Sequence, residues 1–224
     1  METRTKAWHR VGAHTHLALG VQHNGVLVVG TDASLALGDV GPDDAPMLAT
    51  VPAVRFVGLG AIVAGARRLG HESDAGADIV FSSVWAHDLG DCYVEAVFPG
   101  RAATGSDFVV AVPADELVVT GPMVRNPGPP AFTDASWPLE WPAALDMVID
   151  STTAATRFLP GAGEPVDREF VEDQRRAILA VAEQVNVLAR SGVDADDAYD
   201  AGQWPYPEAV VRPAIARAYA HWTP

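Results

Sequence analysis

The sequence predicts an α/β protein in which short strands fill most of the chain and helices become prominent towards its end. β-Branched runs such as Phe108–Val112 are too short for helices and are bounded by turn residues, which is typical of strands. The segment Asp167–Arg190 is typical of an amphipathic helix, because its apolar residues recur at helical spacing: Phe170, Ile178, Val181, Val185 and Leu188. With 224 residues, of which 49% are hydrophobic, the chain can bury a full core as one domain over residues 1–224.

Composition limits the partners and the compartment. The net charge of −14, with only 15 Lys and Arg residues, argues against a nucleic-acid or anionic-membrane partner, since phosphate binding needs clustered cations. A single cysteine, Cys92, excludes an intrachain disulfide and fits a reducing compartment, and no nearby cation marks it as a reactive thiol. The first ten residues lack an apolar signal segment, and the longest apolar run, Phe56–Ala66, is too short to cross a bilayer. These features predict an acidic cytoplasmic protein.

The N-terminal half predicts strands joined by turns. Asn24-Gly25 is a strong hairpin-turn signal between two apolar runs. The strands that we expect here are Thr15–Gln22, Gly25–Val29, Ser34–Gly38, Val54–Leu59, Asp78–Ser82 and Tyr93–Phe98. Between them we expect a connector with a short helix at Gly41–Pro52, a helix and turn at Arg67–Ala77, and a loop or short helix at Val84–Gly90.

The C-terminal half begins with a strand–turn–strand unit. Phe108–Val112 and Leu117–Thr120 are the strands, and Pro113–Glu116 is the turn between them. Val124–Trp141, rich in Pro and Trp, predicts a long lid-like loop. Beyond it we expect a helix at Pro142–Asp150, a strand at Thr156–Leu159, the long helix described above, and a last helix at Ala209–Ala220.

Three motifs carry a resemblance to a known family. They are G-R-A-A-T-G-S-D at 100–107, T-G-P at 120–122 and P-G-A-G-E-P at 160–165. They resemble the G-R-A-H-T-G-G-D, T-G-D and P-G-H-G-x-P motifs of metallo-β-lactamase-fold hydrolases. The resemblance implies an αββα sandwich, with two facing mixed β-sheets and helices outside. It also implies a pocket at one edge, formed by the loops Gly60–Ala64, Gly100–Gly105, Gly121–Arg125 and Pro160–Glu164.

The resemblance breaks down at the metal-ligand positions. Ala103, Pro122 and Ala162 stand where the family has ligands, and Gly60–Ala66 stands where it has T-H-x-H-x-D-H. A catalytic zinc needs at least three N, O or S donors, so the resemblance implies a degenerate member with no metal cofactor. The alternative is a relocated metal site on His14 and His16, whose H-x-H spacing projects both rings to one face of a strand.

Loss of the ligands predicts an apolar cleft. We expect Trp85, Trp137 and the loop around Arg125 to border it, with Arg125 meeting a carboxylate or phenolate. Thr104 and Met123 are the other predicted substrate contacts, while His23 and His87 are the candidate catalytic proton shuttles.

Three functions remain open. The first is a metal-independent cyclase or hydrolase-like enzyme of secondary metabolism that orients a hydrophobic substrate, because metal-bearing relatives include enzymes that act on aromatic polyketides. The second is a carrier of an apolar small molecule. The third is an inactive pseudoenzyme that stabilises an active paralogue of the same fold, so that a homodimer or a heterodimer with such a paralogue is a further expectation.

Overall fold

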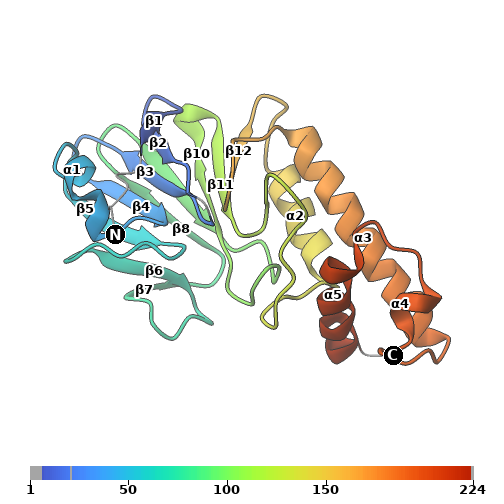
Figure 1. The fold of residues 1–224 in the computed structure, drawn as a ribbon. Coiled ribbons are helices and arrows are strands. Elements are labelled where there is room, and N and C mark those ends of the chain that lie inside the picture. The colour runs from blue at the N-terminus through green and yellow to red at the C-terminus, as the bar shows by residue number, and fades with distance from the viewer. Residues whose placement is uncertain (1–6, 21, 223–224) are drawn as a thin grey trace.

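Two β-sheets lie face to face with helices on both outer sides (Figure 1). The structure is a computed structural model that describes residues 7–20 and 22–222. The predicted αββα sandwich of two facing mixed sheets is therefore confirmed. Met1–Lys6, on which the prediction about a signal segment rests, and Val21, which belongs to the predicted strand Thr15–Gln22, lie outside the described residues.

The first sheet has seven strands in the order β1-β2-β3-β4-β5-β6-β7. Its strands from β1 to β4 are antiparallel, whereas β4 to β7 are parallel. Their bounds are Trp8–Arg10, Thr15–Ala18, Gly25–Val29, Ser34–Gly38, Val54–Gly58, Arg67–His71 and Ile79–Phe81.

The second sheet has five strands in the order β12-β11-β10-β9-β8. All neighbours are antiparallel except β11 and β12, which are parallel. From β8 to β12 the bounds are Val84–Asp88, Tyr93–Val97, Val109–Val112, Leu117–Gly121 and Arg157–Pro160.

The core of the sandwich lies between the sheets. Alternate residues of each strand point inward, as the two-residue period of a strand requires. The first sheet contributes Val26, Val28, Leu35 and Leu37, and the second contributes Val110, Val112, Leu117 and Val119. All of these side chains are buried, and burial stabilises the fold by about 1.5–3 kcal/mol for each of them.

Helices α2 (Trp141–Asp150) and α3 (Arg168–Arg190) cover the outer face of the second sheet and form another core with it. Trp141 is fully buried there, and its Nε1 donates to the carbonyl of Met123 at 3.2 Å. Helix α3 begins after Asp167, whose carboxylate accepts the N–H of Phe170, as a good N-cap does. The predicted long helix is thus confirmed.

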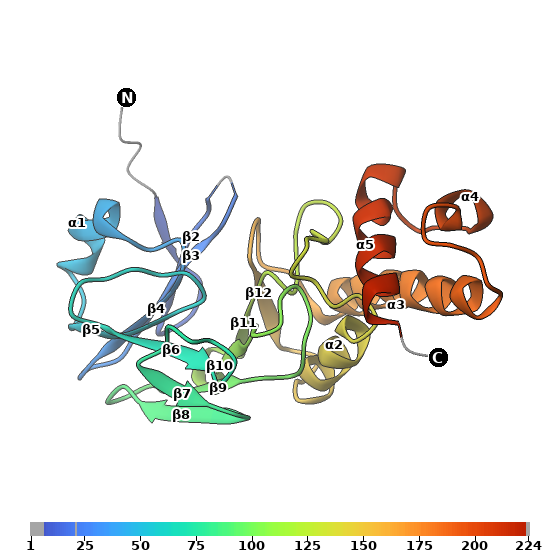
Figure 2. The ribbon, with the colours of Figure 1, turned by 90° about the horizontal axis from the view of Figure 1, so that it is seen from below.

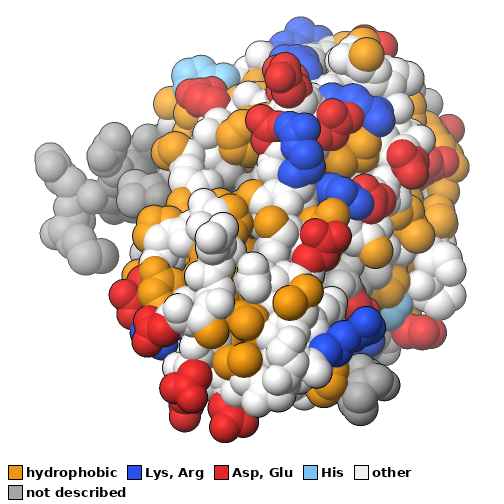
Figure 3. All heavy atoms as spheres, turned by 90° about the vertical axis from the view of Figure 1, so that its right-hand side faces the viewer, with side chains coloured by type: hydrophobic (Ala, Val, Ile, Leu, Met, Phe, Trp, Pro, Cys, Tyr) orange, Lys and Arg blue, Asp and Glu red, His pale blue; other side chains and the backbone are white. Residues whose placement is uncertain are grey.

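Two further helices near the C-terminus extend this layer. They are α4 (Ala198–Ala201) and α5 (Glu208–His221), which pack with α3 beyond the sandwich (Figure 2). On the face that these helices form, acidic and basic side chains intermingle (Figure 3). Ion pairs such as Arg168–Glu172 and Arg175–Asp146 belong to this layer.

Two of the predicted elements are wrong. The segment predicted as a helix at Arg67–Ala77 contains strand β6, because Leu69 packs in the core between the sheets and the backbone pairs with both β5 and β7. Gly70 leaves no room for a side chain, since a Cβ there would lie 2.8 Å from Ala77 Cβ. The segment Val84–Gly90, predicted as a loop or short helix, contains β8. Its pairing with β9 sets its conformation.

The outer face of the first sheet is consequently covered less fully than that of the second. Its helical cover in the described residues consists of η1 (Pro42–Asp44) and α1 (Ala45–Leu48). The remaining predicted strands and helices agree with the structure to within a few residues, and η2 (Pro113–Asp115) occupies the predicted turn. Within residues 7–20 and 22–222, no helix combines the length and apolar character needed to span a bilayer.

Candidate functional site

A cavity of about 420 Å³ opens where β4, β5, β11 and β12 end, at one edge of the sandwich. Hydrocarbon side chains and glycine backbone make up most of its wall. The hydrocarbon groups are Val26, Leu37, Leu59, Val119, Pro122 and Pro160, the glycines are 38, 60, 121 and 161, and the polar residues are His23, Asn24, Asp39 and Asp107. Three of the four loops predicted to form the pocket therefore line it.

The floor of the cavity depends on two glycines. The N–H of Gly161 donates to the carbonyl of Gly121 at 2.6 Å, so the two backbone segments are in direct contact. A Cβ on Gly161 would lie 2.8 Å from the Gly121 carbonyl carbon, and Gly121 itself has a φ of +54°. A side chain at Gly161 would push β11 and the loop after β12 apart, and one at Gly121 would be strained by the positive φ.

Asn24 closes the cavity on the side of the first sheet. Its Nδ2 donates to the carbonyls of Pro160 at 3.0 Å and Gly163 at 2.7 Å, and its Oδ1 accepts the N–H of Gly20 at 3.3 Å. The side chain is buried, and these bonds use both of its polar atoms. Asn24 thus holds the two halves of the sandwich together at the cavity.

Asp107 is the buried carboxyl group of the cavity wall, with 6% of its surface exposed. Burial raises its pKa, although hydrogen bonds from the backbone N–H groups of Thr104 and Ala103 and from Thr104 Oγ1, at 2.8 Å, act in the opposite direction. A raised pKa makes this buried carboxyl group a candidate for acid–base chemistry in the cavity.

Asp107 is a site residue that the sequence motifs alone did not single out. Its signal was present, because it is the last residue of the G-R-A-A-T-G-S-D motif. Thr104, a predicted substrate contact, is not among the residues that line the cavity and instead positions Asp107 through its hydroxyl and N–H.

His23 is the predicted site residue that does line the cavity, where its side chain is exposed at the mouth. His87, the other predicted proton shuttle, lies on β8 with Trp85. The His87 ring packs 4.5 Å from the ring of Phe56 and 5.4 Å from that of Trp85, centroid to centroid. Neither His87 nor Trp85 lines the cavity.

The other predicted contacts are also dispersed. Trp137 lies between the Arg101 guanidinium, 3.6 Å from its ring, and the His221 ring, 3.8 Å away, and borders a separate small pocket. Met123 is fully buried and offers its carbonyl to Trp141 and Gln174. The backbone N–H of Arg125 donates to Gln174 at 3.2 Å, and its side chain does not line the cavity.

The residues at the family's metal positions do not fit a catalytic zinc. Pro122 and Gly60 line the cavity, while Ala103 and Ala162 are buried beside it, and none of these side chains carries a donor atom. Across residues 7–20 and 22–222, no three His, Cys, Asp or Glu side chains converge in a way that would hold a metal ion.

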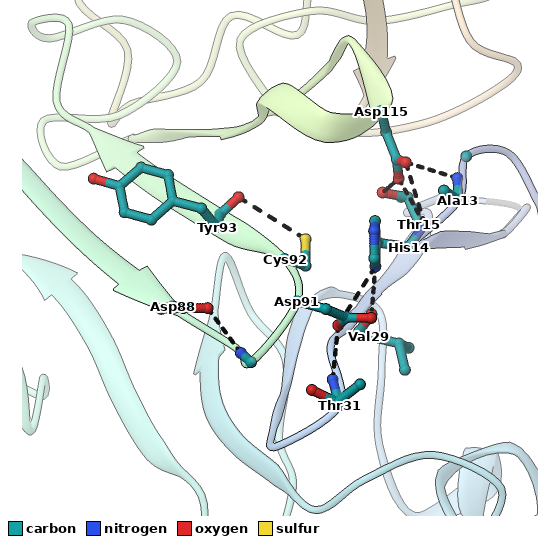
Figure 4. A network of polar contacts seen from close by, with 12 residues as sticks. Ala13, His14, Thr15, Val29, Thr31, Asp88, Asp91, Cys92, Tyr93 and Asp115 are labelled. Carbon is teal, nitrogen blue, oxygen red and sulfur yellow. Dashed lines mark hydrogen bonds and ion pairs between the residues drawn. The ribbon is translucent and has the colours of Figure 1, made fainter.

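Within residues 7–20 and 22–222, His14 and His16 have no third His, Cys, Asp or Glu side chain placed to complete the alternative metal site. His14 Nδ1 lies 3.1 Å from the carbonyl oxygen of Val29 and 3.9 Å from Asp91 Oδ1 (Figure 4). The pKa of His16 is lowered by burial and then by Arg10.

Burial raises the pKa of the Cys92 thiol to about 11, with further contributions from Asp115, Asp91 and Asp88. This agrees with the prediction that no nearby cation makes Cys92 a reactive thiol.

Comparison with solved structures shows which fold this is. A metallo-β-lactamase from Pontibacter korlensis matches with a TM-score of 0.68 and 15% identity, covering 78% of this chain and 99% of that one. The DIM-1 metallo-β-lactamase exposed to ceftazidime matches with a TM-score of 0.67 and 14% identity, covering 80% and 99%. VMB-1 matches with a TM-score of 0.65 and 15% identity, covering 81% and 100%.

No protein-family model matches the sequence, and no curated protein matches it either. At these identities the structural likeness establishes the fold alone. The chain has the metallo-β-lactamase fold, and hydrocarbon side chains or glycine stand at the positions that the family motifs assign to metal ligands.

Proposed function

We propose that this chain is a metal-independent protein of the metallo-β-lactamase fold that binds a hydrophobic small molecule in the cavity between its sheets. The single observation that carries the proposal is the wall of that cavity, where hydrocarbon side chains and glycine backbone surround four polar residues. A volume of about 420 Å³ falls in the range of small-molecule sites, which are mostly apolar with a few placed polar groups.

The polar residues suggest a role in chemistry as well as in binding. Asp107, a buried carboxyl group with a raised pKa, is the candidate acid–base group inside the cavity, and the His23 side chain lies at its mouth. Holding a reactive ligand in one folded conformation would supply the rest of the rate enhancement. The finer proposal is a cyclase or hydrolase-like reaction on an aromatic, polyketide-like substrate, the class that the family resemblance suggests.

The binding site is tested by blocking the cavity mouth. Pro122 is exposed at the rim, so Pro122→Trp would place a large side chain over the opening without disturbing the core. Affinities for a panel of apolar aromatic ligands, measured by calorimetry, should fall at least about tenfold in this variant. Pro46→Trp, an exposed position on α1, should bind like the parent. Equal affinity in all three proteins would place the ligand elsewhere.

Metal independence is tested separately by elemental analysis of the purified protein and by unfolding with and without chelator. We expect much less than one zinc, iron or manganese per chain and an unchanged melting temperature, because a structural metal stabilises a fold by several kcal/mol or more. One metal per chain, lost in a His14→Ala/His16→Ala double variant, would overturn this part of the proposal in favour of the relocated site.

A further inference from the structure

A second cavity, of about 500 Å³, opens on another side of the sandwich. It lies beside the first residues of β5 and β6 and next to β8. Its distinctive lining residues are Arg55, Arg67, Phe56 and His87, and the rest of its wall is formed by small or aliphatic residues. No Asp or Glu of the described chain lines it, in a protein whose net charge is −14.

Arginine and aromatic side chains line the same cavity. Phe56 and Arg67 are directly paired in the parallel register of β5 and β6, so their side chains leave the sheet on the same side. The His87 ring packs at 67° to the Phe56 ring, and the Trp85 ring stacks on His87 at 9°. Phe56, His87 and Trp85 thus form an aromatic cluster, and two of its members, Phe56 and His87, line the same cavity as Arg67.

Neither arginine forms an ion pair within residues 7–20 and 22–222, and both are exposed. Arg67 Nη2 makes only a long contact, of 3.4 Å, with the backbone carbonyl of Asp78. The Asp78 carboxylate instead accepts the N–H of Arg68 at 2.8 Å, and the Arg68 guanidinium pairs with Asp74 at 2.9 Å. Apart from the bond to Asp78, the donors of the Arg67 guanidinium are therefore available to a ligand.

We propose that this cavity binds a small aromatic acid. The carboxylate would accept two parallel N–H bonds from Arg67, the arrangement that a guanidinium favours, while the ring packs against Phe56 and His87. Arg55 also lines the cavity and adds a second positive charge to its wall. This site is independent of the apolar cavity and of its proposed function.

The test compares an acid with its neutral counterpart. Naphthalene-2-carboxylate and naphthalene-2-carboxamide share a ring system and differ in charge, and calorimetry would measure both affinities. We expect the acid to bind roughly tenfold or more tightly than the amide, and Arg67→Gln to remove that preference while leaving amide binding unchanged. Arg190→Gln, an exposed arginine at the end of α3, is the matched control and should behave like the parent.

Backbone NMR shifts on adding the acid locate the site. Shifts in β5, β6 and around His87, retained in the Pro122→Trp variant, would support the proposal. Three results would overturn it. They are shifts confined to His23 and Gly121, equal affinity for the acid and the amide, and equal affinity for the acid in Arg67→Gln and the parent. Displacement of the acid by equimolar inorganic phosphate would overturn the choice of an aromatic acid, because phosphate has no ring to pack against Phe56 and His87.

Discussion

Thr15 Oγ1 donates a hydrogen bond of 2.6 Å to Oδ2 of Asp115, a residue 100 positions further along the chain. The same carboxylate accepts the N–H groups of Ala13 at 2.6 Å and His14 at 3.0 Å (Figure 4). It therefore joins the start of β2 in the first sheet to η2, the turn between β10 and β11 of the second sheet.

Asp115→Ala should lower the free energy of unfolding by about 2–3 kcal/mol, because it leaves three donors without their acceptor. Thr15→Val removes one of these hydrogen bonds. The free energy of unfolding lost by the double variant should be smaller than the sum of the losses in the two single variants. Urea unfolding measures the stability of all three variants. Asp196→Ala, at an exposed carboxylate, is the control, and additivity of the two losses would show that the bond contributes nothing.

Asn24→Ala should destabilise the protein by about 1–3 kcal/mol, because the carbonyls of Pro160, which is buried, and Gly163, which is half-buried, lose their donor. Asn24→Asp keeps the shape but turns the donor into an acceptor that faces two carbonyl oxygens, so it should cost at least as much. Gln22→Ala, two residues away and exposed, should stay within about 0.5 kcal/mol of the parent. Thermal or urea unfolding decides between these outcomes.

Asp107 should make the protein less stable as the pH rises. Its pKa in the folded state is raised by burial above the ordinary value of 3.8, so the folded chain holds the proton longer than the unfolded chain does. The contribution of the protonated form is complete below the unfolded pKa and is lost as the pH rises through the folded pKa. Asp107→Asn should remove this dependence, whereas Asp134→Asn, at an exposed position, should keep it. Carbon NMR titration of the carboxyl group checks the direction independently.

His221 should have the opposite effect on the pH dependence of stability, making the protein less stable as the pH falls. Its pKa is lowered by burial, then by Arg217 and Arg101, while Glu140 opposes the shift. The unfolded chain therefore takes up this proton first, and stability falls as the pH drops below about 6.5. His221→Gln should flatten the difference in unfolding free energy between pH 7 and pH 5. His16, whose pKa is also lowered, remains in both proteins, and His9→Gln is the exposed control.

Cys92 should react very slowly with thiol reagents in the native protein. A pKa of about 11 leaves almost no thiolate at pH 8, and the side chain is buried. Alkylation followed by mass spectrometry should show one modification only after unfolding in denaturant. Modification of the native protein as fast as that of the unfolded chain would contradict the burial and the raised pKa.

Much of the local structure was already determined by the sequence. The hairpin of β10 and β11 follows from two β-branched runs with a Pro-containing turn between them, and α3 follows from its apolar spacing and the Asp167 cap. Hydrocarbon side chains at 103, 122 and 162 likewise determine that these positions offer no metal ligand, because donor atoms are a property of the side chain itself.

Tertiary structure decided what depends on neighbours. Arg67–His71 became a strand because β5 and β7 offered backbone partners on both sides, a long-range contact that local propensity does not record. Trp85 and Trp137 were predicted to border one cleft, with His87 as a proton shuttle. Pairing of β8 with β9 instead places Trp85 and His87 against Phe56, while Trp137, in the loop before α2, packs with Arg101 and His221. The pKa of Asp107 is raised because the folded chain buries its carboxyl group, and burial exists only once residues distant in sequence have packed together.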